Sequence, residues 1–322
     1  MDTAGAELFD GTRAIWQGEV GRRYSGEGIV TKSDLAPRLP NFLVIGAMKA
    51  GTTSLFHYLQ AHPQVFMSPL KELDFFVAEA NWTRGLGWYR KQFAGAGPDV
   101  TAIGEASTSY TKFPQYRGAP QRIRACLTAP RLIYVVRNPI DRIRSHYQHR
   151  VLAGSERQPL GEAVMRDPTY VDCSRYGFQL AQYLEYFSPE QILVITAEAL
   201  REARASTISE VYSFIGVDSG FVPDILEQEF YRTEERARYP TYVWSLRRFV
   251  KKHFPVSKKA KEFVDSVLPR LLRRTPLAGK APARSQFDMP DDVRRRLAAM
   301  LSADMHQLRA FMPEGFDGWL IA

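Results

Sequence analysis

The sequence is poor in the features that hold small secreted or metal-dependent domains together. Its 322 residues include only two cysteines, Cys126 and Cys173, and neither lies in a CxxC motif or a Cys/His cluster. This excludes a disulfide framework and a structural zinc site, and it favours a reducing compartment. The N-terminus has no apolar signal-peptide core, and no apolar run approaches the roughly eighteen residues of a membrane-spanning helix. We expect a cytoplasmic protein without a transmembrane segment.

Negative charge is scarce relative to positive charge, so that the net charge is +8. A polyanionic nucleotide, nucleic acid and an acidic membrane surface would each be attracted by this excess. Residues 242–280 hold much of it, with lysines and arginines interleaved among apolar residues. That pattern is typical of a solvated pair of basic helices packed on a domain. Contact with an anionic acceptor or a peripheral membrane contact is the first alternative, and nucleic-acid binding is the second.

Short apolar runs alternate with stretches of helical periodicity along the chain. The predicted strands are 41–45, 131–136 and 192–195, and the predicted helical stretches are 52–61, 139–150, 177–187 and 207–215. Strands alternating with helices predict an α/β fold, with a parallel sheet covered on both faces. Residues 1–40 are weakly periodic and are predicted to form a peripheral N-terminal extension. Residues 41–322 are predicted to form a single domain.

A glycine-containing loop between the first predicted strand and helix is the most informative segment. Gly46 and Gly51 have the spacing of a Walker A motif, and such loops point backbone N–H groups at an anion. Thr52 stands where Walker A has its lysine, and Lys49 comes two positions before Gly51 instead. This arrangement does not suit the β- and γ-phosphates and magnesium of ATPases. A nucleotide whose single 5′-phosphate bears a sulfonate needs neither.

Five motifs follow one another in order: KAGTTSL at 49–55, HPQV at 62–65, KELDFF at 71–76, GEASTSY at 104–110 and VVRNPIDRIRSHY at 135–147. In this order they resemble the sulfotransferases that use 3′-phosphoadenosine 5′-phosphosulfate (PAPS), most closely the heparan-sulfate-type and related bacterial enzymes. The resemblance runs from about Phe42 to Phe214. It implies a P-loop-NTPase-like central parallel β-sheet flanked by α-helices. It also implies PAPS as cosubstrate, 3′-phosphoadenosine 5′-phosphate (PAP) as product, and no metal.

The resemblance also assigns residues to the nucleotide. The 5′-phosphosulfate would be bound by Lys49, Ala50, Gly51, Thr52, Thr53 and Ser54. Ser54 has an alternative role in capping or packing the helix. Arg137 and Ser145 would bind the 3′-phosphate, and Arg142 and Arg144 are expected on a solvated helix face. Lys280 and Arg284 match more loosely a basic loop that closes over the nucleotide.

For the chemistry, the resemblance points to Glu72 as the general base, with Lys49 stabilising the leaving phosphate oxygen. A carboxylate is a weak base in water, so its site must raise its pKa or hold it in line. The alternative for Glu72 is a surface glutamate paired with a neighbouring lysine. Asp74 is the main rival carboxylate, and His57, His62, His146 and His149 are better suited to packing or capping. Ala106 stands where related glycan enzymes often carry lysine.

Taken together, the sequence predicts transfer of a sulfonate group to a hydroxyl or amine of a glycan, glycolipid or natural product, without nucleic acid as a partner. Two alternatives from other classes stay open. An ATP-dependent P-loop enzyme would require magnesium and a lysine directly after Gly51, where the chain has Thr52. A non-catalytic binder of nucleic acid or anionic surfaces would depend on the basic residues 247–274 and not on Lys49. The acceptor and the oligomeric state are not predicted.

Overall fold

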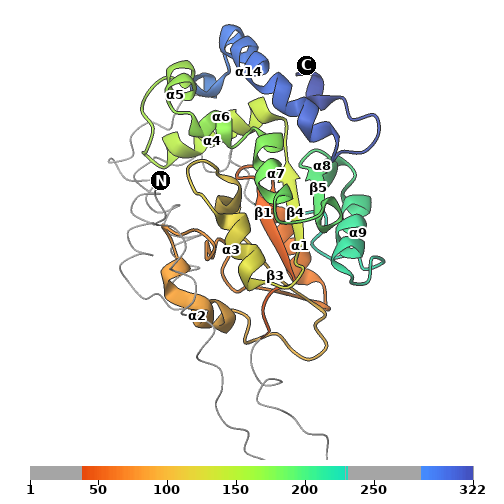
Figure 1. Cartoon of the computed structure of the whole chain (residues 1–322). Helices are drawn as coiled ribbons and strands as arrows, with labels where there is room; N and C mark the ends of the chain where they lie inside the picture. Colours follow the sequence, from red (N-terminus) through yellow and green to blue (C-terminus); the bar gives the residue numbers. More distant parts are fainter. Residues whose placement is uncertain (1–37, 229, 231–283, 322) are drawn as a thin grey trace, which may run out of the picture. The chain divides into compact units, whose positions relative to one another are not determined.

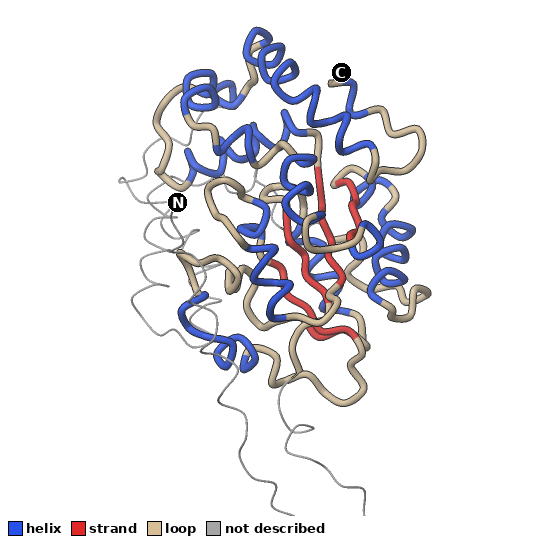
Figure 2. The backbone as a smooth tube through the Cα atoms, viewed as in Figure 1, coloured by secondary structure: helices blue, strands red, loops and turns tan. Residues whose placement is uncertain are grey.

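The fold is organised around five short strands that all run in the same direction. The computed structural model describes residues 38–228, 230 and 284–321. The strands are β1 (Phe42–Gly46), β2 (Val65–Met67), β3 (Ala102–Ala106), β4 (Arg131–Val136) and β5 (Ile192–Thr196). They form a parallel sheet in the order β2-β3-β1-β4-β5 (Figures 1 and 2). The predicted parallel α/β sheet is confirmed.

Three strands were predicted, and two were not. The predicted runs correspond to β1, β4 and β5, which are apolar and almost wholly buried. β2 has only three residues, and β3 reads AIGEA, with a glycine and a glutamate in its centre. A short strand or one that carries a charge gives little periodic signal. Only pairing with β1 identifies β3 as a central strand.

Helices fill the connections between the strands. The α-helices are α1 (Thr52–Ala61), α2 (Gly85–Lys91), α3 (Ala119–Cys126), α4 (Pro139–Leu152), α5 (Leu160–Arg166), α6 (Thr169–Asp172), α7 (Tyr176–Leu184), α8 (Ala199–Glu202), α9 (Arg204–Ile215) and α14 (Asp291–Arg309). The 3₁₀ helices are η2 (Trp82–Arg84), η3 (Thr108–Thr111), η4 (Pro189–Gln191), η6 (Arg284–Phe287) and η7 (Gly318–Leu320). The four predicted helical stretches correspond to α1, α4, α7 and α9. The basic stretch 242–280 and most of the predicted extension 1–40 lie outside the described residues.

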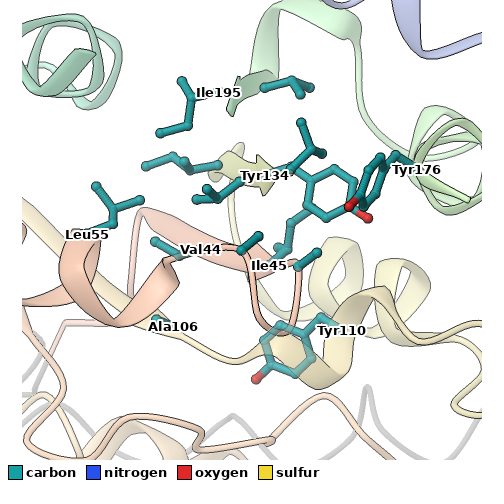
Figure 3. Close-up of a cluster of buried hydrophobic side chains, with 14 of the residues drawn as sticks. Val44, Ile45, Leu55, Ala106, Tyr110, Tyr134, Tyr176 and Ile195 are labelled. Atoms are coloured by element: carbon teal, nitrogen blue, oxygen red, sulfur yellow. The ribbon is translucent and has the colours of Figure 1, made fainter. Parts of the chain in front are cut away.

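The sheet is covered on both faces, as predicted for parallel strands. α1 and α9 lie side by side on one face, where the Tyr212 hydroxyl donates to the Tyr58 carbonyl over 2.9 Å. α3 and α7 lie on the other face (Figure 1), where the Tyr183 hydroxyl donates to the Tyr110 carbonyl over 2.9 Å. Figure 3 shows side chains from α1, η3 and α7 gathered around β1 and β4. None of the helices within the described ranges is long and apolar enough to cross a bilayer.

The C-terminal helix α14 is joined to α7 by a buried carboxylate. Asp304 is only 4% exposed, and it accepts hydrogen bonds from the backbone N–H groups of Gly177 at 3.0 Å and Phe178 at 2.7 Å. These N–H groups belong to the first turn of α7, where no carbonyl within the helix can pair with them. Asp304 therefore caps α7 from a helix more than a hundred residues later in the chain.

Candidate active site at the carboxyl edge of the sheet

The predicted site residues follow the ends of four neighbouring strands. The glycine loop follows β1, Glu72 follows β2, and Arg137 follows β4, while β3 leads into Ser107 and Thr108. Since all strands are parallel, these ends meet at one edge of the sheet. The chain builds on one side of β1 with β2 and β3 and on the other side with β4 and β5. In open α/β sheets, ligands bind in the crevice at such a switch point.

The loop after β1 has the backbone that an anion site requires. Gly51 has a left-handed φ of 94° directly before α1, and Lys49 has a φ of 73°. A side chain at Gly46 would lie 1.9 Å from the Thr111 hydroxyl, so the loop needs glycine there. The first N–H groups of α1 lack partners within the helix and carry the positive end of its dipole. The structure therefore supports the interpretation of this segment as an anion-binding loop.

Arg137 lies against this loop. Its Nη1 donates to the Lys49 carbonyl over 3.4 Å, and its own carbonyl accepts from the Tyr176 hydroxyl over 2.7 Å. Asn138 caps α4 by accepting from the N–H groups two and three residues later, and Pro139 begins the helix. Ser145 is buried on α4. The structure thus brings Arg137 into contact with the loop predicted for the 5′-phosphosulfate, and it places Ser145 on the helix that follows Arg137.

The prediction that Arg142 lies on a solvated helix face is wrong. Its side chain is 0% exposed, and its guanidinium donates to the Ser174 hydroxyl at 2.5 Å, the Tyr170 carbonyl at 2.5 Å and the Met48 carbonyl at 3.5 Å. Met48 belongs to the loop after β1, so Arg142 places a buried positive charge behind that loop. Arg144 is partly exposed and pairs with an aspartate one turn earlier, as expected. The two arginines differ because only position 142 of α4 faces the loop.

Glu72 is held against the end of β3 by both its backbone and its carboxylate. Its N–H donates to the Ala106 carbonyl over 2.8 Å, and its Oε2 accepts from the Thr108 N–H at 2.8 Å and the Thr108 hydroxyl at 3.2 Å. Its Oε1 pairs with Lys71, and the side chain is 37% exposed. The lysine pairing that we considered as an alternative is therefore present. The hydrogen bonds from Thr108 nevertheless fix the carboxylate at the edge of the site.

The aromatic pair after Glu72 is part of the core. Phe75 stacks on Tyr89 with ring centroids 4.3 Å apart, and Phe76 is in edge contact with the same ring at 5.2 Å. Both phenylalanines are buried. Asp74, between them and Glu72, has a raised pKa because it is partly buried and lies near the Glu72 charge.

A third carboxylate, Glu105, was not predicted as a site residue. It is 0% exposed within β3, and it accepts hydrogen bonds from the hydroxyls of Tyr89 at 2.9 Å, Ser107 at 2.7 Å and Tyr110 at 2.6 Å. Burial raises its pKa to about 7. The sequence contained no signal for it, because β3 was not predicted as a strand and the donors to Glu105 come from separate segments.

The histidines considered as bases serve packing, as expected. His62 is buried, with its Nε2 3.0 Å from the Asp218 carbonyl. His146 is buried against the Tyr170 ring at 4.6 Å, and burial together with the Arg142 charge lowers its pKa strongly. His57 lies 4.3 Å from the Phe230 ring, and burial lowers its pKa also. These three imidazoles sit within packed surroundings.

The remaining predicted ligands are placed only in part. Arg284 begins η6, and Phe287 of the same short helix makes an edge contact with Tyr147 of α4 at 6.2 Å. The short helix that begins at Arg284 thus contacts α4, which also bears Ser145, while Lys280 lies outside the described residues. In the part of the chain that the structure describes, no group of three or more histidine, cysteine, aspartate or glutamate side chains is arranged to hold a metal ion.

Comparison with known proteins agrees with this geometry. The chain is 30% identical over 234 residues to the bifunctional heparan sulfate N-deacetylase/N-sulfotransferase 3 of Homo sapiens, which covers 66% of this chain and 26% of that protein. It is 29% identical over 219 residues to the human heparan sulfate glucosamine 3-O-sulfotransferase 5, covering 64% of this chain and 60% of that protein. The chain therefore matches about a quarter of the first relative's length and rather more of the second.

The fold and the family are established by two further comparisons. A crystal structure of a sulfotransferase from Alicyclobacillus acidocaldarius has the same fold, with a TM-score of 0.63, 24% identity, and coverage of 88% of this chain and 99% of that chain. A family model described as the sulfotransferase domain matches residues 39–263, which is more than half of the sequence. This match, together with the loop after β1 and the site at the carboxyl edge of the sheet, shows that the chain belongs to the sulfotransferase family.

Proposed function

We propose that this protein transfers a sulfonate group from PAPS to a hydroxyl or amine acceptor. The observation that carries the proposal is the contact between Arg137 and the Lys49 loop at the sheet edge that also holds Glu72. In the reaction, the bond between sulfur and the 5′-phosphate oxygen breaks, and its electron pair stays on the phosphate of PAP. A new bond forms between sulfur and the acceptor oxygen or nitrogen. The acceptor proton passes to Glu72.

The groups around the loop suit this nucleotide better than ATP. Backbone N–H groups and the hydroxyls of Thr52 and Thr53 can bind a single 5′-phosphate. Arg137 offers a planar fork for a second phosphate, and Ser145 adds a hydroxyl on the next helix. PAPS carries a phosphate at each of these two ends, whereas ATP carries all three phosphates at one end.

Glu72 and Lys49 have opposite tasks in the proposed reaction. Glu72 accepts the proton of the attacking group, and the Thr108 hydrogen bonds to Oε2 hold it in one orientation. Lys49 stabilises the negative charge that develops on the leaving phosphate oxygen. Such preorganised charge is usually the largest contribution to the rate, and loss of one such group costs about 100- to 1,000-fold. Positioning of the two reactants supplies much of the rest.

The acceptor class is proposed from the relatives. The two human proteins are named for sulfotransfer to heparan sulfate, one for N-sulfotransfer and the other for 3-O-sulfotransfer to glucosamine. A glucosamine residue offers an amine and several hydroxyls. We therefore propose an amino-sugar glycan as the first acceptor to test, ahead of glycolipids and other natural products.

Calorimetric titration tests the nucleotide part of this proposal. We expect PAP to bind without magnesium, AMP to bind much more weakly, and Arg137→Ala to weaken PAP binding. Binding of ATP only in the presence of magnesium would contradict the proposal and favour an ATP-dependent enzyme. Transfer of ³⁵S from labelled PAPS to N-unsubstituted heparosan, compared with its fully N-acetylated form, then tests the acceptor. Equal labelling of both polymers would point to hydroxyl rather than amine sulfonation.

A further inference from the structure

Glu105 is an unusual group to find inside a parallel sheet. Its carboxyl group is fully buried, and its hydrogen-bond partners are three hydroxyls rather than a lysine or an arginine. Burying a carboxyl group away from water is costly unless hydrogen bonds satisfy it. An apolar residue at this place in β3 would avoid the cost altogether. The arrangement therefore calls for a role beyond packing.

Two of the three hydroxyls connect Glu105 to the segment that carries Glu72. Ser107 Oγ donates to Glu105 Oε2 over 2.7 Å and accepts from the Asp74 N–H over 3.0 Å. Tyr110 Oη donates to Glu105 Oε1 over 2.6 Å and accepts from the Phe76 N–H over 3.4 Å. A hydroxyl has one proton to give. Because each gives it to Glu105, its lone pairs are left facing the backbone of residues 74–76.

The segment held in this way does not have a relaxed backbone. Glu72 has a φ of 62° and Asp74 a φ of 48°, both in the left-handed region that residues other than glycine rarely occupy. Each such residue costs about 1–2 kcal/mol. The bonds of Glu72 to Ala106 and Thr108 hold one end of the segment, and the relays from Glu105 hold the other. Hydrogen bonds from the end of β3 and from η3 thus fix the conformation of residues 72–76.

We propose that Glu105 is a positioning residue, whose carboxylate orients the Ser107 and Tyr110 hydroxyls and so holds the segment that presents Glu72 to the acceptor. This inference rests on the proposed role of Glu72 as general base. It assigns to Glu105 no contact with either substrate. Glutamine at position 105 keeps the size and two-atom reach of glutamate but replaces one acceptor oxygen by a donor. One hydroxyl must then turn its proton away from residue 105.

The test is a double-mutant cycle measured as PAP release from PAPS, with N-unsubstituted heparosan and with water alone as acceptor. We expect Glu105→Gln to lower kcat by about 10- to 100-fold, as for a reacting group moved out of line. Its affinity for PAP should be unchanged, and its Tm should not fall, because a buried charge has been removed. In the Glu72→Gln background, the same substitution should have little further effect, because the group that it positions is already gone.

Removing single hydroxyls distinguishes two roles: linking Glu105 to the backbone of residues 74–76, and only supplying a hydrogen bond to the Glu105 carboxylate. Ser107→Ala and Tyr110→Phe each remove a donor to Glu105 and also a link to residues 74–76. Tyr89→Phe is the matched control, since the Tyr89 hydroxyl donates to the same carboxylate from α2, over 2.9 Å. We expect the first two to lower kcat several-fold more than the control.

Different outcomes overturn different claims. Equal losses in both backgrounds, or a fall in PAP affinity or Tm that matches the fall in kcat, would overturn the positioning role in favour of a general structural one. Equal effects of Tyr89→Phe and Tyr110→Phe would overturn the claim that the Tyr110 hydroxyl acts by linking Glu105 to residues 74–76. Full turnover by Glu72→Gln alone would instead overturn the base assignment of the proposed function, whatever Glu105→Gln does.

Discussion

The two sides of the site carry groups of opposite charge. The nucleotide side, formed by the loop after β1 and the start of α4, combines backbone N–H groups with the cations of Lys49, Arg137 and Arg142. The base side, formed by residues 71–76 on the end of β3, gathers three carboxylates, those of Glu72, Asp74 and Glu105. Under the proposed function, the first side binds the anionic nucleotide and the second receives the acceptor proton.

The central strand β1 lies between the two strands that lead into these regions. It pairs with β3, which carries the base side, and with β4, which leads into Arg137. Both pairings are ladders of backbone hydrogen bonds within a buried core. The sheet therefore fixes the strand ends from which the cationic loop and the acidic segment start. For a transfer that requires donor, sulfur and acceptor to lie in line, this is the part of the geometry that matters most.

Removing the central group of either side should have the largest effect. We expect Lys49→Ala and Glu72→Gln each to lower turnover by about 100- to 1,000-fold. The comparison becomes sharper in the binding data, because only Lys49→Ala should also weaken PAP binding. Steady-state kinetics and calorimetry on the same preparations check both expectations. Weakened PAP binding in Glu72→Gln would show that the two sides are not separate.

A smaller effect is expected when a cation at the margin of the nucleotide side is removed. A hydrogen bond to a charged group contributes about 1.5–3 kcal/mol, so Arg137→Ala should weaken PAP binding by about 10- to 100-fold. Arg144→Ala is the matched control, because Arg144 lies on α4, the helix that follows Arg137, with its side chain 39% exposed in an ion pair. Similar losses in the two variants would mean that net charge, and not a specific contact, governs binding.

The base side should respond to pH in two opposite ways. Burial raises the pKa of Glu105 to about 7, so its ionised form, and with it turnover, should rise as the pH passes through about 7. Tyr89 and Tyr110 stay neutral there because their pKa values are raised well above 10.0, and burial raises those of Asp74 and of Cys126 on α3. Turnover measured as a function of pH for the wild type and Glu105→Gln checks this rise near pH 7, which the variant should lack.

Stability should change in the other direction. The folded protein holds the Glu105 proton more tightly than the unfolded chain, so protonation of Glu105 favours folding. Its contribution to the free energy of unfolding is present below pH 4.5 and is lost as the pH rises through about 7. Denaturant titrations of wild type and Glu105→Gln between these limits check it. Stability and turnover that rise together with pH would contradict the assignment.

The smallest effect is expected at the cap of α7, which reaches the nucleotide side through the hydrogen bond from the Tyr176 hydroxyl to the Arg137 carbonyl. Asp304→Ala should lower the free energy of unfolding by about 1–2 kcal/mol, because two N–H groups lose their acceptor. The control is Asp292→Ala, because Asp292 is exposed in the first turn of α14, the helix that also carries Asp304. PAP affinity measured below the unfolding transition should stay within about 2-fold of the wild type, since the Asp304 cap stabilises α7 and is not itself proposed to bind the nucleotide.

The sequence predicted the nucleotide side better than the base side. The loop, the start of α1 and the Asn138 cap are local features, in which residues a few positions apart interact. On the base side, the donors to Glu105 come from α2, from the end of β3 and from η3. Such a set has no spacing that could be recognised along the chain. Glu72 was found only through its resemblance to a family motif.

Arg142 shows the same limit within a single helix. Arg142 and Arg144 are alike in the sequence, and helical periodicity does not say which one meets the loop. Packing of α4 against Met48, Tyr170 and Ser174 decided it. The sequence by itself determined the apolar strands, the glycine loop and the helix starts, because these depend on backbone preferences and nearest neighbours. Only the tertiary structure decided which charges are buried and which hydroxyls they meet, because those contacts join segments that the chain keeps far apart.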